Sequence, residues 1–483
     1  MSGPVGLDPE LQMMRARGLH LVEHTDQVGP HTIFVCISTN IETAHAYCKT
    51  ALEAGVEYFV LDSLLRDLIA VEGLEHAIYV ANLAADRGQL AALYYGQPSQ
   101  QMTCVGITGT NGKTSVAYHV ANLYEQLGGV AGYCGTLGCG RLSDLKDAGM
   151  TTPDPTAVQR YLAELLAQDC TLVAMEVSSH ALDQGRVDAV AFDVAVFTNL
   201  SRDHLDYHET MEAYFAAKAR LFKFSSLQHI VCNIDAPYGL ELAQQLANSP
   251  AQLTTVGGDG DWTWQRVDGG VEISHQQATL RSALPLVADF QFENVTAAIA
   301  GVVAAGAHLA DIEAVLSQVS TVPGRLQPVH LPDDQRGDSP LVVVDYAHTP
   351  DALHKALLAF REGVRGDVTC VVGCGGDRDV GKRPRMGCIA AQHSDHLIVT
   401  SDNPRSEDPA RIAQDMLAEL PDGVDVVVEL DRKRAIAAAI HAAGAADGVL
   451  IAGKGHENYQ EINGSRYPFD DYEVARSLLM EVA

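Results

Sequence analysis

GITGTNGKTS, residues 106–115, decides the fold of this chain. It follows the apolar run MTCV and precedes VAYHVANLYEQL, which has the composition of a helix. A strand, a glycine-rich turn and a helix in this order predict a phosphate-binding loop, because N–H groups of the turn and of the helix start converge on anionic oxygens. Lys113 is placed to bridge the outer phosphates of a nucleotide, and the Thr114 hydroxyl to bind magnesium. The usual pattern has a glycine five positions before the Gly112–Lys113 pair, where this chain has Ile107.

Short runs rich in valine and isoleucine recur on both sides of the loop, with longer helical stretches between them. They begin at residues 31, 56, 102, 170, 194 and 229, and again at 341, 368, 396, 424 and 448. Such alternation is typical of parallel sheets covered by helices, so the predicted fold class is α/β. Residues 253–289 alternate apolar and polar side chains around turn residues, which predicts appended antiparallel strands.

Clusters of Pro, Gly and Asp at residues 94–100 and 320–340 predict breaks between domains. We therefore expect a small N-terminal α/β domain at 1–98, a central, mostly parallel phosphate-loop domain at 99–329, and a C-terminal Rossmann-like α/β domain at 330–483. A chain of 483 residues has the length of two to four domains, each able to bury its own core.

Composition and charge exclude several classes of function. The net charge of -29 argues against binding to nucleic acid or to anionic membranes, because both need a basic face. The amino terminus MSGPVGLDPELQ lacks the pattern of a signal peptide, and the longest apolar run, residues 297–310, is shorter than a membrane span. We expect a monomeric cytoplasmic protein that neither inserts into membranes nor binds nucleic acid.

The ten cysteines are scattered along the chain. Cys134 with Cys139, and Cys370 with Cys374, are the closest pairs, and neither has the partners of a zinc site. We expect reduced cysteines and no zinc.

Further motifs follow the loop in a fixed order. They are AMEVSSHALDQGRV from 174, FTNLSRDHLDYH from 197, YFAAKARLF from 214, VPGRLQPV from 322, VVVDYAHTPDAL from 342, GCGGDRDVGKRPRM from 373, SDNPRSEDP from 401 and AGKGHENYQ from 452. With GTNGKTS, these motifs resemble those of the Mur ligase family, the ATP-dependent amide-bond enzymes of peptidoglycan precursor synthesis, over residues 90–483. The resemblance implies a ligase that joins meso-diaminopimelate to the D-glutamate side-chain carboxylate of UDP-N-acetylmuramoyl-L-alanyl-D-glutamate, through an acyl phosphate, with ATP and Mg²⁺.

The resemblance also assigns roles around the nucleotide. It implies an ATP site formed by Gly109, Thr110, Asn111, Gly112, Lys113, Thr114, Ser115, Asn294, Arg325, Asp345 and His348. Glu176 and His204 join Thr114 as magnesium ligands, and Lys218 is carbamylated by carbon dioxide; Lys113, Lys218, Glu176 and His204 are the catalytic set. By residue type alone, His204 is more typical of a hydrogen-bonding loop residue, and Lys218 of a solvated helix lysine.

Two further sets of residues are implied for the substrates. The UDP-linked substrate is held by Thr25, Thr151, Thr152, Ser178, Gln184 and Arg186, and the amino acid by Arg378, Asp402, Asn403, Pro404, Arg405, Gly453 and Glu457. Arg405 suits a two-pronged contact with the distal carboxylate of diaminopimelate, which lysine lacks. Arg378, Lys382, Arg383 and Arg385 lie within eight residues of this acidic chain, which predicts an anion-binding cluster.

The first domain departs from the family pattern. Relatives carry an Asp-Ser-Arg triplet and then a glycine-rich loop, where this chain has Thr25, Asp26 and residues 40–43. Asp26 beside a diphosphate would repel it. Two alternatives therefore remain open: a related ligase that adds an amino acid to a different carboxylate, and a homologue without catalytic activity. The intact Lys113, Glu176, His204 and Lys218 argue against the second.

Overall fold

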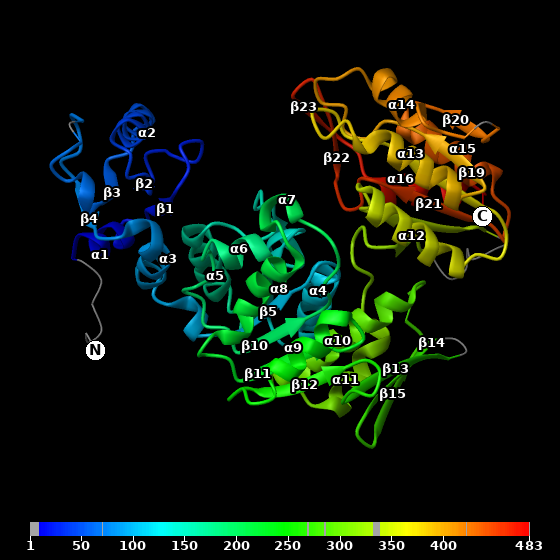
Figure 1. Ribbon diagram of the computed structural model, residues 1–483, viewed down its shortest axis with the longest axis horizontal. Helices are drawn as coiled ribbons and strands as arrows, with labels where there is room; N and C mark the ends of the chain where they lie inside the picture. The colour runs from blue at the N-terminus through cyan, green and yellow to red at the C-terminus, as the bar shows by residue number, and fades with distance from the viewer. Residues whose placement is uncertain are drawn as a thin grey trace. The chain divides into compact units, whose positions relative to one another are not determined.

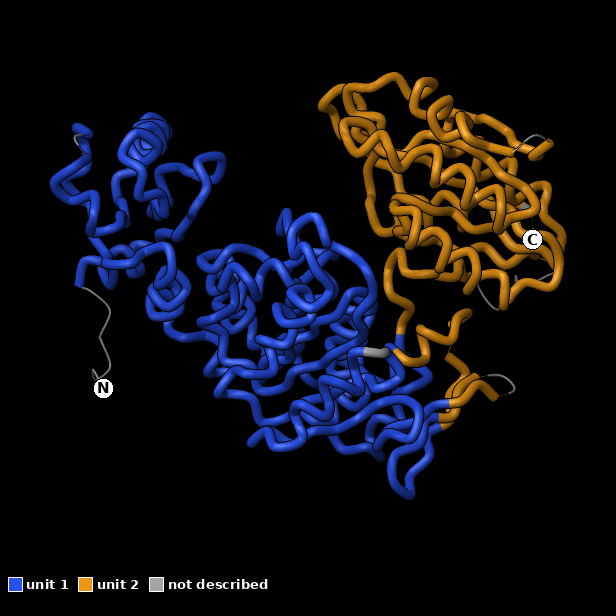
Figure 2. Tube along the Cα trace, in the orientation of Figure 1, with its two compact units in different colours: residues 1–264, 273–280, 294–319 blue, residues 265–272, 281–293, 320–483 orange. Residues whose placement is uncertain are grey.

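The computed structural model describes residues 9–69, 71–267, 270–284, 286–331, 339–421 and 423–482. Parts of the predicted break at 320–340, of the appended strands and of the amino terminus lie outside these ranges. Contacts divide the chain into two compact units (Figure 2). The first comprises Met1–Trp264, Ile273–Leu280 and Asn294–Val319, and the second Gln265–Glu272, Arg281–Glu293 and Ser320–Ala483. The division into three domains stays a prediction.

The N-terminal part of the first unit contains a four-stranded parallel sheet in the order β1-β2-β3-β4 (Figure 1). Its elements are α1 (Pro9–Ala16), β1 (His20–Val22), β2 (Thr32–Cys36), α2 (Ile41–Glu53), β3 (Tyr58–Asp62), η1 (Ser63–Leu65), β4 (Ala77–Val80) and α3 (Leu83–Tyr94). The Asn40 side chain accepts a hydrogen bond from the Thr43 N–H and so caps α2. Residues 40–43, which replace the family's glycine-rich loop, thus form a helix start.

A sheet of eleven strands forms the centre of the first unit, in the order β15-β14-β13-β12-β11-β10-β5-β9-β6-β7-β8. Its strands are β5 (Thr103–Thr108), β6 (Ala131–Gly135), β7 (Gly138–Arg141), β8 (Asp144–Lys146), β9 (Leu172–Glu176), β10 (Val194–Phe197), β11 (His229–Asn233), β12 (Gln252–Val256), β13 (Trp262–Val267), β14 (Gly270–His275) and β15 (Ala278–Ser282). The strands from β12 to β6 pair in parallel, whereas β6, β7 and β8 pair antiparallel. Strands β13–β15 occupy the stretch predicted to carry appended strands.

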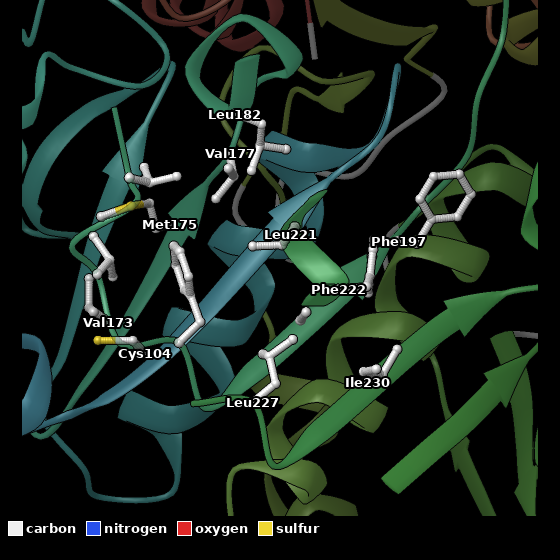
Figure 3. Close-up of a cluster of buried hydrophobic side chains, with 14 of the residues drawn as sticks. Cys104, Val173, Met175, Val177, Leu182, Phe197, Leu221, Phe222, Leu227 and Ile230 are labelled. Carbon is white, nitrogen blue, oxygen red and sulfur yellow. The ribbon is translucent and has the colours of Figure 1, made fainter. Parts of the chain in front are cut away.

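Helices cover both faces of the parallel strands. They are η2 (Pro98–Gln100), α4 (Lys113–Gln126), α5 (Pro155–Leu166), α6 (Ser179–Asp183), α7 (Leu205–His208), α8 (Met211–Ala219), η3 (Arg220–Lys223), α9 (Pro237–Gln245), α10 (Asp289–Ala304), α11 (Leu309–Val315) and η4 (Leu316–Gln318). Alternate strand residues such as Cys104, Met175 and Phe197 point into one buried cluster with Leu182 and Leu221 (Figure 3). The carboxyl ends of β5, β9 and β10 share one edge, where the phosphate-loop and Glu176 lie.

The second unit contains a six-stranded sheet in the order β16-β17-β21-β18-β19-β20, which is parallel except for β16. Its elements are β16 (Gln327–Pro328), β17 (Leu341–Asp345), α12 (Pro350–Glu362), β18 (Val368–Val372), α13 (Lys382–His393), β19 (His396–Val399), α14 (Pro409–Leu417), β20 (Val426–Val428), α15 (Arg432–Ala442), β21 (Gly448–Ala452), β22 (Tyr459–Ile462), β23 (Ser465–Pro468) and α16 (Asp471–Val482). Helices α12–α14 pack on one face, and α15 and α16 on the other. The predicted α/β class is confirmed. None of the described helices combines the length and apolar character that crossing a bilayer requires.

Candidate active site

The phosphate-loop needs two glycines for reasons of space and backbone angle. Gly109 has φ 154°, and a Cβ there would lie 1.9 Å from Thr198 Oγ1. Gly112 has φ 83°, and a Cβ there would lie 2.5 Å from Asn294 Oδ1, which places Asn294 beside the loop. Ile107 lies within β5, fully buried and paired with Glu176 and Val196. The position that holds glycine in the usual pattern therefore belongs to the core strand here.

The loop is tied to the segment that follows β10. Thr110 Oγ1 lies 3.1 Å from the Tyr214 hydroxyl, and the Asn111 N–H donates to Asn199 Oδ1 at 3.0 Å. Lys113 begins α4, and its Nζ donates to the carbonyl oxygens of Gly109 and Thr110 at 3.0 and 2.9 Å. The first turn of α4 also contains Thr114 and Ser115, both buried. The structure thus brings the predicted loop residues together at a helix N-terminus, which favours anions.

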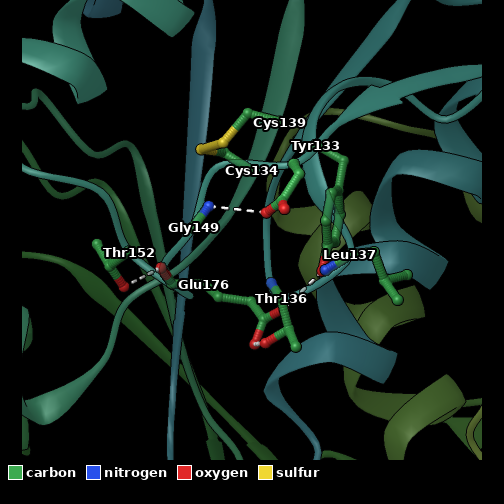
Figure 4. Close-up of a disulfide and its surroundings, with 9 residues drawn as sticks. Tyr133, Cys134, Thr136, Leu137, Cys139, Gly149, Thr152 and Glu176 are labelled. Atoms are coloured by element: carbon green, nitrogen blue, oxygen red, sulfur yellow. Dashed lines mark hydrogen bonds between the residues drawn. A yellow bond between two sulfur atoms is a disulfide. The ribbon is translucent and has the colours of Figure 1, made fainter. Parts of the chain in front are cut away.

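Glu176 is buried at the end of β9 and is the centre of a hydrogen-bonded cluster. Its Oε2 accepts from Thr114 Oγ1 at 3.0 Å, and its Oε1 from the Tyr133 hydroxyl at 2.5 Å and the Thr136 N–H at 2.8 Å. Figure 4 shows Thr136 and Tyr133 beside the Glu176 carboxylate. A hydroxyl and a carboxylate this close are hard oxygen ligands, so Thr114 and Glu176 fit a magnesium ion.

His204 lies outside this cluster. It has φ 51° before α7, its side chain is about half exposed, and its contacts are with Asp203 at 3.5 Å and with the rings of His180 and Tyr214. Among the residues that the structure describes, no three His, Cys, Asp or Glu side chains form a group able to hold a metal. The geometry joins two of the three predicted magnesium ligands, and the role of His204 stays a prediction.

Lys218 is buried in α8 rather than solvated. Its Nζ donates to the Gly109 carbonyl oxygen at 2.7 Å and lies 4.5 Å from the centre of the Tyr214 ring. Burial, together with the charge of Lys113, holds the pKa of Lys218 well below its usual range. The environment therefore favours the uncharged amine.

Five of the six residues predicted for the UDP-linked substrate lie together. The Thr152 hydroxyl donates to the Glu176 carbonyl oxygen at 2.9 Å and accepts from the Ser178 N–H at 3.0 Å. Arg186 donates to the Thr152 carbonyl oxygen at 2.9 Å and to Gln184 Oε1 at 2.6 Å. Thr151 and Thr136 hydroxyls are 3.2 Å apart, which connects this group to the Glu176 cluster.

Thr25 belongs to a turn of the N-terminal part that contacts α5. Its neighbour His24 lies 2.8 Å from Asp154, and Glu23 accepts from the Thr156 N–H at 3.1 Å. Asp154 in turn lies 4.0 Å from Arg186. The turn is therefore linked to the Arg186 group, with Asp26 exposed to solvent on it.

In the second unit, three predicted ATP residues lie around the end of β17. Asp345 accepts from the N–H groups of Leu326 and Ala347 at 2.7 and 2.8 Å, and burial raises its pKa. Arg325 lies over the Tyr346 ring at 5.0 Å, and His348 Nδ1 is 2.9 Å from the Tyr346 carbonyl oxygen. Burial lowers the pKa of His348.

The residues predicted for the amino acid are brought together by the loops after β19 and β21. Asn403 Nδ2 donates to Glu457 Oε2 at 2.7 Å, and a Cβ on Gly453 would lie 2.7 Å from Asp402 Oδ2. Arg405 has φ 51°, and its Nη1 donates to the Gly376 carbonyl oxygen at 2.7 Å. Pro404, which precedes Arg405 in the sequence, is buried. Arg378 is exposed and lies near Arg405, because a Cβ on Gly375 would contact the side chains of both arginines.

The predicted anion cluster is wrong for one member. Arg383 is buried and pairs with Glu407 at 2.7 Å and Asp415 at 2.9 Å. Lys382 donates to the His348 carbonyl oxygen at 2.8 Å. Because a buried guanidinium needs carboxylate partners, Arg383 is a structural cation that Glu407 and Asp415 neutralise.

Several residues that support the site were not predicted. They include Tyr133 and Thr136 at Glu176, Lys454 at Glu457, and Arg432. Arg432 pairs with Asp471 and donates to the carbonyl oxygens of Ser401 and Ala452, where β19 and β21 lead into the amino-acid site. Lys454 lies within the motif AGKGHENYQ, so the sequence held a signal for it. Tyr133 and Arg432 lie outside every motif.

The expectation of reduced cysteines is wrong for one pair. Cys134 and Cys139 face each other on β6 and β7 and form a disulfide (Figure 4). A tight antiparallel hairpin brings them within bonding distance, which spacing alone did not reveal. The remaining cysteines are free, and Cys370 and Cys374 are buried.

One parallel sheet carries a phosphate-loop beside a buried carboxylate, and the loops of a second sheet bring together the residues predicted for an amino acid; this arrangement fits the class of ATP-dependent ligases. Residues 107–302 match the Mur ligase middle domain, and residues 324–455 match the Mur ligase, glutamate ligase domain. The chain belongs to the Mur ligase family and is an ATP-dependent ligase that forms amide bonds. The resemblance stated from the motifs is confirmed.

Relatives match over most of the chain. It is 43% identical over 479 residues to the UDP-N-acetylmuramoyl-L-alanyl-D-glutamate--2,6-diaminopimelate ligase of Xylella fastidiosa (strain 9a5c), covering 95% of this chain and 93% of that protein. The protein of the same name from Pseudomonas aeruginosa is 46% identical over 410 residues, 83% of each chain. A solved structure with that name has 34% identity and a TM-score of 0.67, over 96% of this chain and 95% of the other. MurF ligase from Thermotoga maritima in complex with ADP shares the fold, with 15% identity and a TM-score of 0.62 over 96% and 97% of the two chains.

Proposed function

We propose that the protein joins meso-diaminopimelate to the D-glutamate side-chain carboxylate of UDP-N-acetylmuramoyl-L-alanyl-D-glutamate, with ATP, in peptidoglycan precursor synthesis. The observation that carries the proposal is identity of 41–46% to ligases named for this reaction, over most of the chain. Asp402, Asn403, Arg405 and Glu457 lie together at one site, and this grouping supports meso-diaminopimelate as the amino-acid substrate.

The chemistry requires activation of a carboxylate, because oxide is too poor a leaving group for attack by an amine. Transfer of the γ-phosphoryl group of ATP to the carboxylate gives an acyl phosphate and ADP. The neutral amine of diaminopimelate attacks its carbonyl carbon, and phosphate leaves as the amide forms. Lys113 and the N–H groups at the start of α4 would bind and orient the phosphates, which is the main contribution a protein makes to phosphoryl transfer.

Magnesium and a modified lysine belong to the same proposal. Thr114 and Glu176 would hold Mg²⁺, with His204 as the third ligand, and the ion would neutralise charge on the phosphate oxygens. Lys218 would react as an uncharged amine with carbon dioxide, giving a carbamate and a proton. This replaces a neutral amine next to Lys113 by an anion, and the lowered pKa of Lys218 supports it.

The substrate and amino-acid sites complete the assignment. Thr151, Thr152, Ser178, Gln184 and Arg186 would bind the UDP-linked substrate near Glu176, with Thr25 at the uridine side. Arg405 would bind the distal carboxylate of diaminopimelate, and Glu457 an ammonium group. We also propose a monomer in the cytoplasm that does not bind nucleic acid; the net charge of -29 supports the last point.

A second candidate is a ligase of the same chemistry that acts on a different carboxylate. The observation that favours it is the Thr25–Asp26 turn, where an acidic side chain is exposed at the place expected to meet a diphosphate. Phosphate release from ATP, measured with diaminopimelate and with or without the UDP-linked dipeptide, separates the two. Dependence on the dipeptide is the expected result. Release without it, or lysine serving as well as diaminopimelate, would overturn the proposal.

A further inference from the structure

We propose that Lys454 sets the amino-acid selectivity of this ligase, as a positioning residue that fixes the Asn403 amide and the Glu457 carboxylate. The inference rests on the proposed function. Lys454 lies in the loop between β21 and β22 and is fully buried. Burial of an ammonium group is costly unless its donors are all paired, so its partners indicate why it is there.

The three donors of Lys454 are directed at three acceptors of the amino-acid site. Nζ lies 2.5 Å from the Tyr459 carbonyl oxygen, 3.1 Å from Glu457 Oε2 and 3.3 Å from Asn403 Oδ1. An ammonium group has three N–H donors and no acceptor, so this set uses its whole capacity. The cation therefore serves the site and not solvent.

The first consequence concerns the orientation of Asn403. Its Oδ1 accepts from Lys454 and from the Glu461 N–H at 2.9 Å. Two donors at one end of an amide decide which end is oxygen, so Nδ2 must face Glu457, to which it donates at 2.7 Å. Without Lys454 one of these two constraints is lost.

The second consequence concerns Glu457. Lys454 and Asn403 both donate to Oε2, which fixes the carboxylate at one oxygen. The lone pairs of Oε1 are then available in a set direction for an ammonium group of the amino acid. Glu457 is partly exposed, with 20% of its side chain accessible, as a group that meets a substrate must be.

The third consequence links this acceptor to Arg405. Lys454 holds the start of β22 through the Tyr459 carbonyl oxygen, and β22 holds Arg405. The Arg405 N–H donates to the Glu461 carbonyl oxygen at 2.9 Å, and the Asn463 N–H donates to that of Arg405 at 2.7 Å. One cation thus fixes both the ammonium acceptor and the backbone of the arginine for the distal carboxylate. Diaminopimelate presents both an ammonium group and a distal carboxylate to these two residues, whereas lysine lacks the distal carboxylate.

The test uses the full chain with Lys454→Met, which keeps the stem and removes the charge, and Lys454→Arg, which keeps the charge in another shape. The control is Arg361→Met, because Arg361 pairs with Asp395 at the opposite edge of the same sheet. Calorimetric titration with meso-diaminopimelate and with L-lysine is followed by KM and kcat measurements. Lys454→Met should weaken diaminopimelate binding about 30-fold or more, with KM for ATP within about twofold. Lys454→Arg should recover part of this loss, and Arg361→Met should show none.

A double-mutant cycle with Glu457→Gln separates positioning from general stability. If Lys454 acts through Glu457, Lys454→Met should add little to the loss already caused by Glu457→Gln. Full additivity, or equal losses of diaminopimelate and ATP affinity with a lowered Tm, would overturn the inference. Should Lys454→Met not fold, diaminopimelate affinity unchanged in Lys454→Arg would overturn it as well. Wild-type protein that binds ATP but not diaminopimelate would instead refute the proposed function, and the inference with it.

Discussion

Lys113 and Lys218 donate to one and the same acceptor, the carbonyl oxygen of Gly109, at 3.0 and 2.7 Å. Two ammonium groups this close repel each other, and Lys218 is also buried. The pKa of Lys218 is lowered by burial first and by Lys113 second. The pair is therefore arranged to keep Lys218 uncharged, which is the form that the proposed reaction with carbon dioxide requires.

This arrangement predicts that Lys218→Arg loses activity at least about 100-fold, because a guanidinium stays charged and forms no stable carbamate. The matched control is Lys223→Arg, an exposed lysine of η3, which should retain activity. Wild-type protein in ¹³C-bicarbonate should give a carbamate carbon signal that Lys218→Arg lacks. An active Lys218→Arg protein would exclude the carbamate.

The lowered pKa of Lys218 also predicts how the stability of the protein depends on pH. The lowered pKa of Lys218 means that the unfolded chain binds more protons between that pKa and the usual 10.5, so stability rises with pH across this window. Lys218→Met removes the titration, and in bicarbonate-free buffer its unfolding midpoint should depend less on pH than that of wild type. Identical pH slopes for the two proteins would show that Lys218 titrates normally.

Arg405→Ala should raise KM for diaminopimelate about 30-fold or more, and KM for ATP by less than about threefold, because only the amino acid presents a distal carboxylate to it. Arg411→Ala removes an exposed arginine of the nearby helix α14 and serves as the control. Steady-state phosphate release with each substrate varied in turn gives both constants. Equal increases in the two would count against the assignment of Arg405.

The hydrogen bond from Arg383 lowers the pKa of Glu407 to about 2 from a usual 4.5. A depressed carboxyl pKa contributes stability that is fully present above pH 4.5 and is lost as pH falls toward 2. The stability difference between wild type and Glu407→Gln, from urea unfolding, should therefore shrink across this window. Asp351→Asn, which breaks an exposed pair with Lys355, should change stability by less than about 1 kcal/mol at any pH. A difference for Glu407→Gln that does not vary with pH would refute the pairing.

Much of the fold and part of the site could be predicted from sequence, and the reason differs from residue to residue. The alternation of apolar runs and helices predicted the parallel sheets, because buried parallel strands leave a continuous apolar signature. Thr114 lies in the motif that follows β5, and Glu176 ends the neighbouring strand β9, so their meeting followed from the edge that parallel strands share.

What could not be predicted depends on which residues the fold places beside one another. Arg383 has the appearance of an anion ligand until Glu407 and Asp415 are placed beside it. The Cys134–Cys139 disulfide depends on the register of the β6–β7 hairpin. Ile107 takes the place of the glycine of the usual phosphate-loop pattern because this position lies in the buried strand β5. Sequence gives the chemical type of each residue, but its partners decide the role.

The last prediction concerns the turn of the N-terminal part, where the family pattern fails. Asp26 is exposed beside Thr25, at the position where the family resemblance implies an arginine. If the UDP group binds at this turn, Asp26→Arg replaces repulsion by attraction and should lower KM for the UDP-linked dipeptide several-fold, more at low salt than at high salt. Glu53→Arg makes the same charge change at the end of α2, at the opposite edge of the sheet, and should leave that KM unchanged. Initial rates with the dipeptide varied, at two ionic strengths, give the comparison. If Asp26→Arg and Glu53→Arg behave alike, the turn does not meet the diphosphate, and the ligase with a different carboxylate substrate becomes the better assignment.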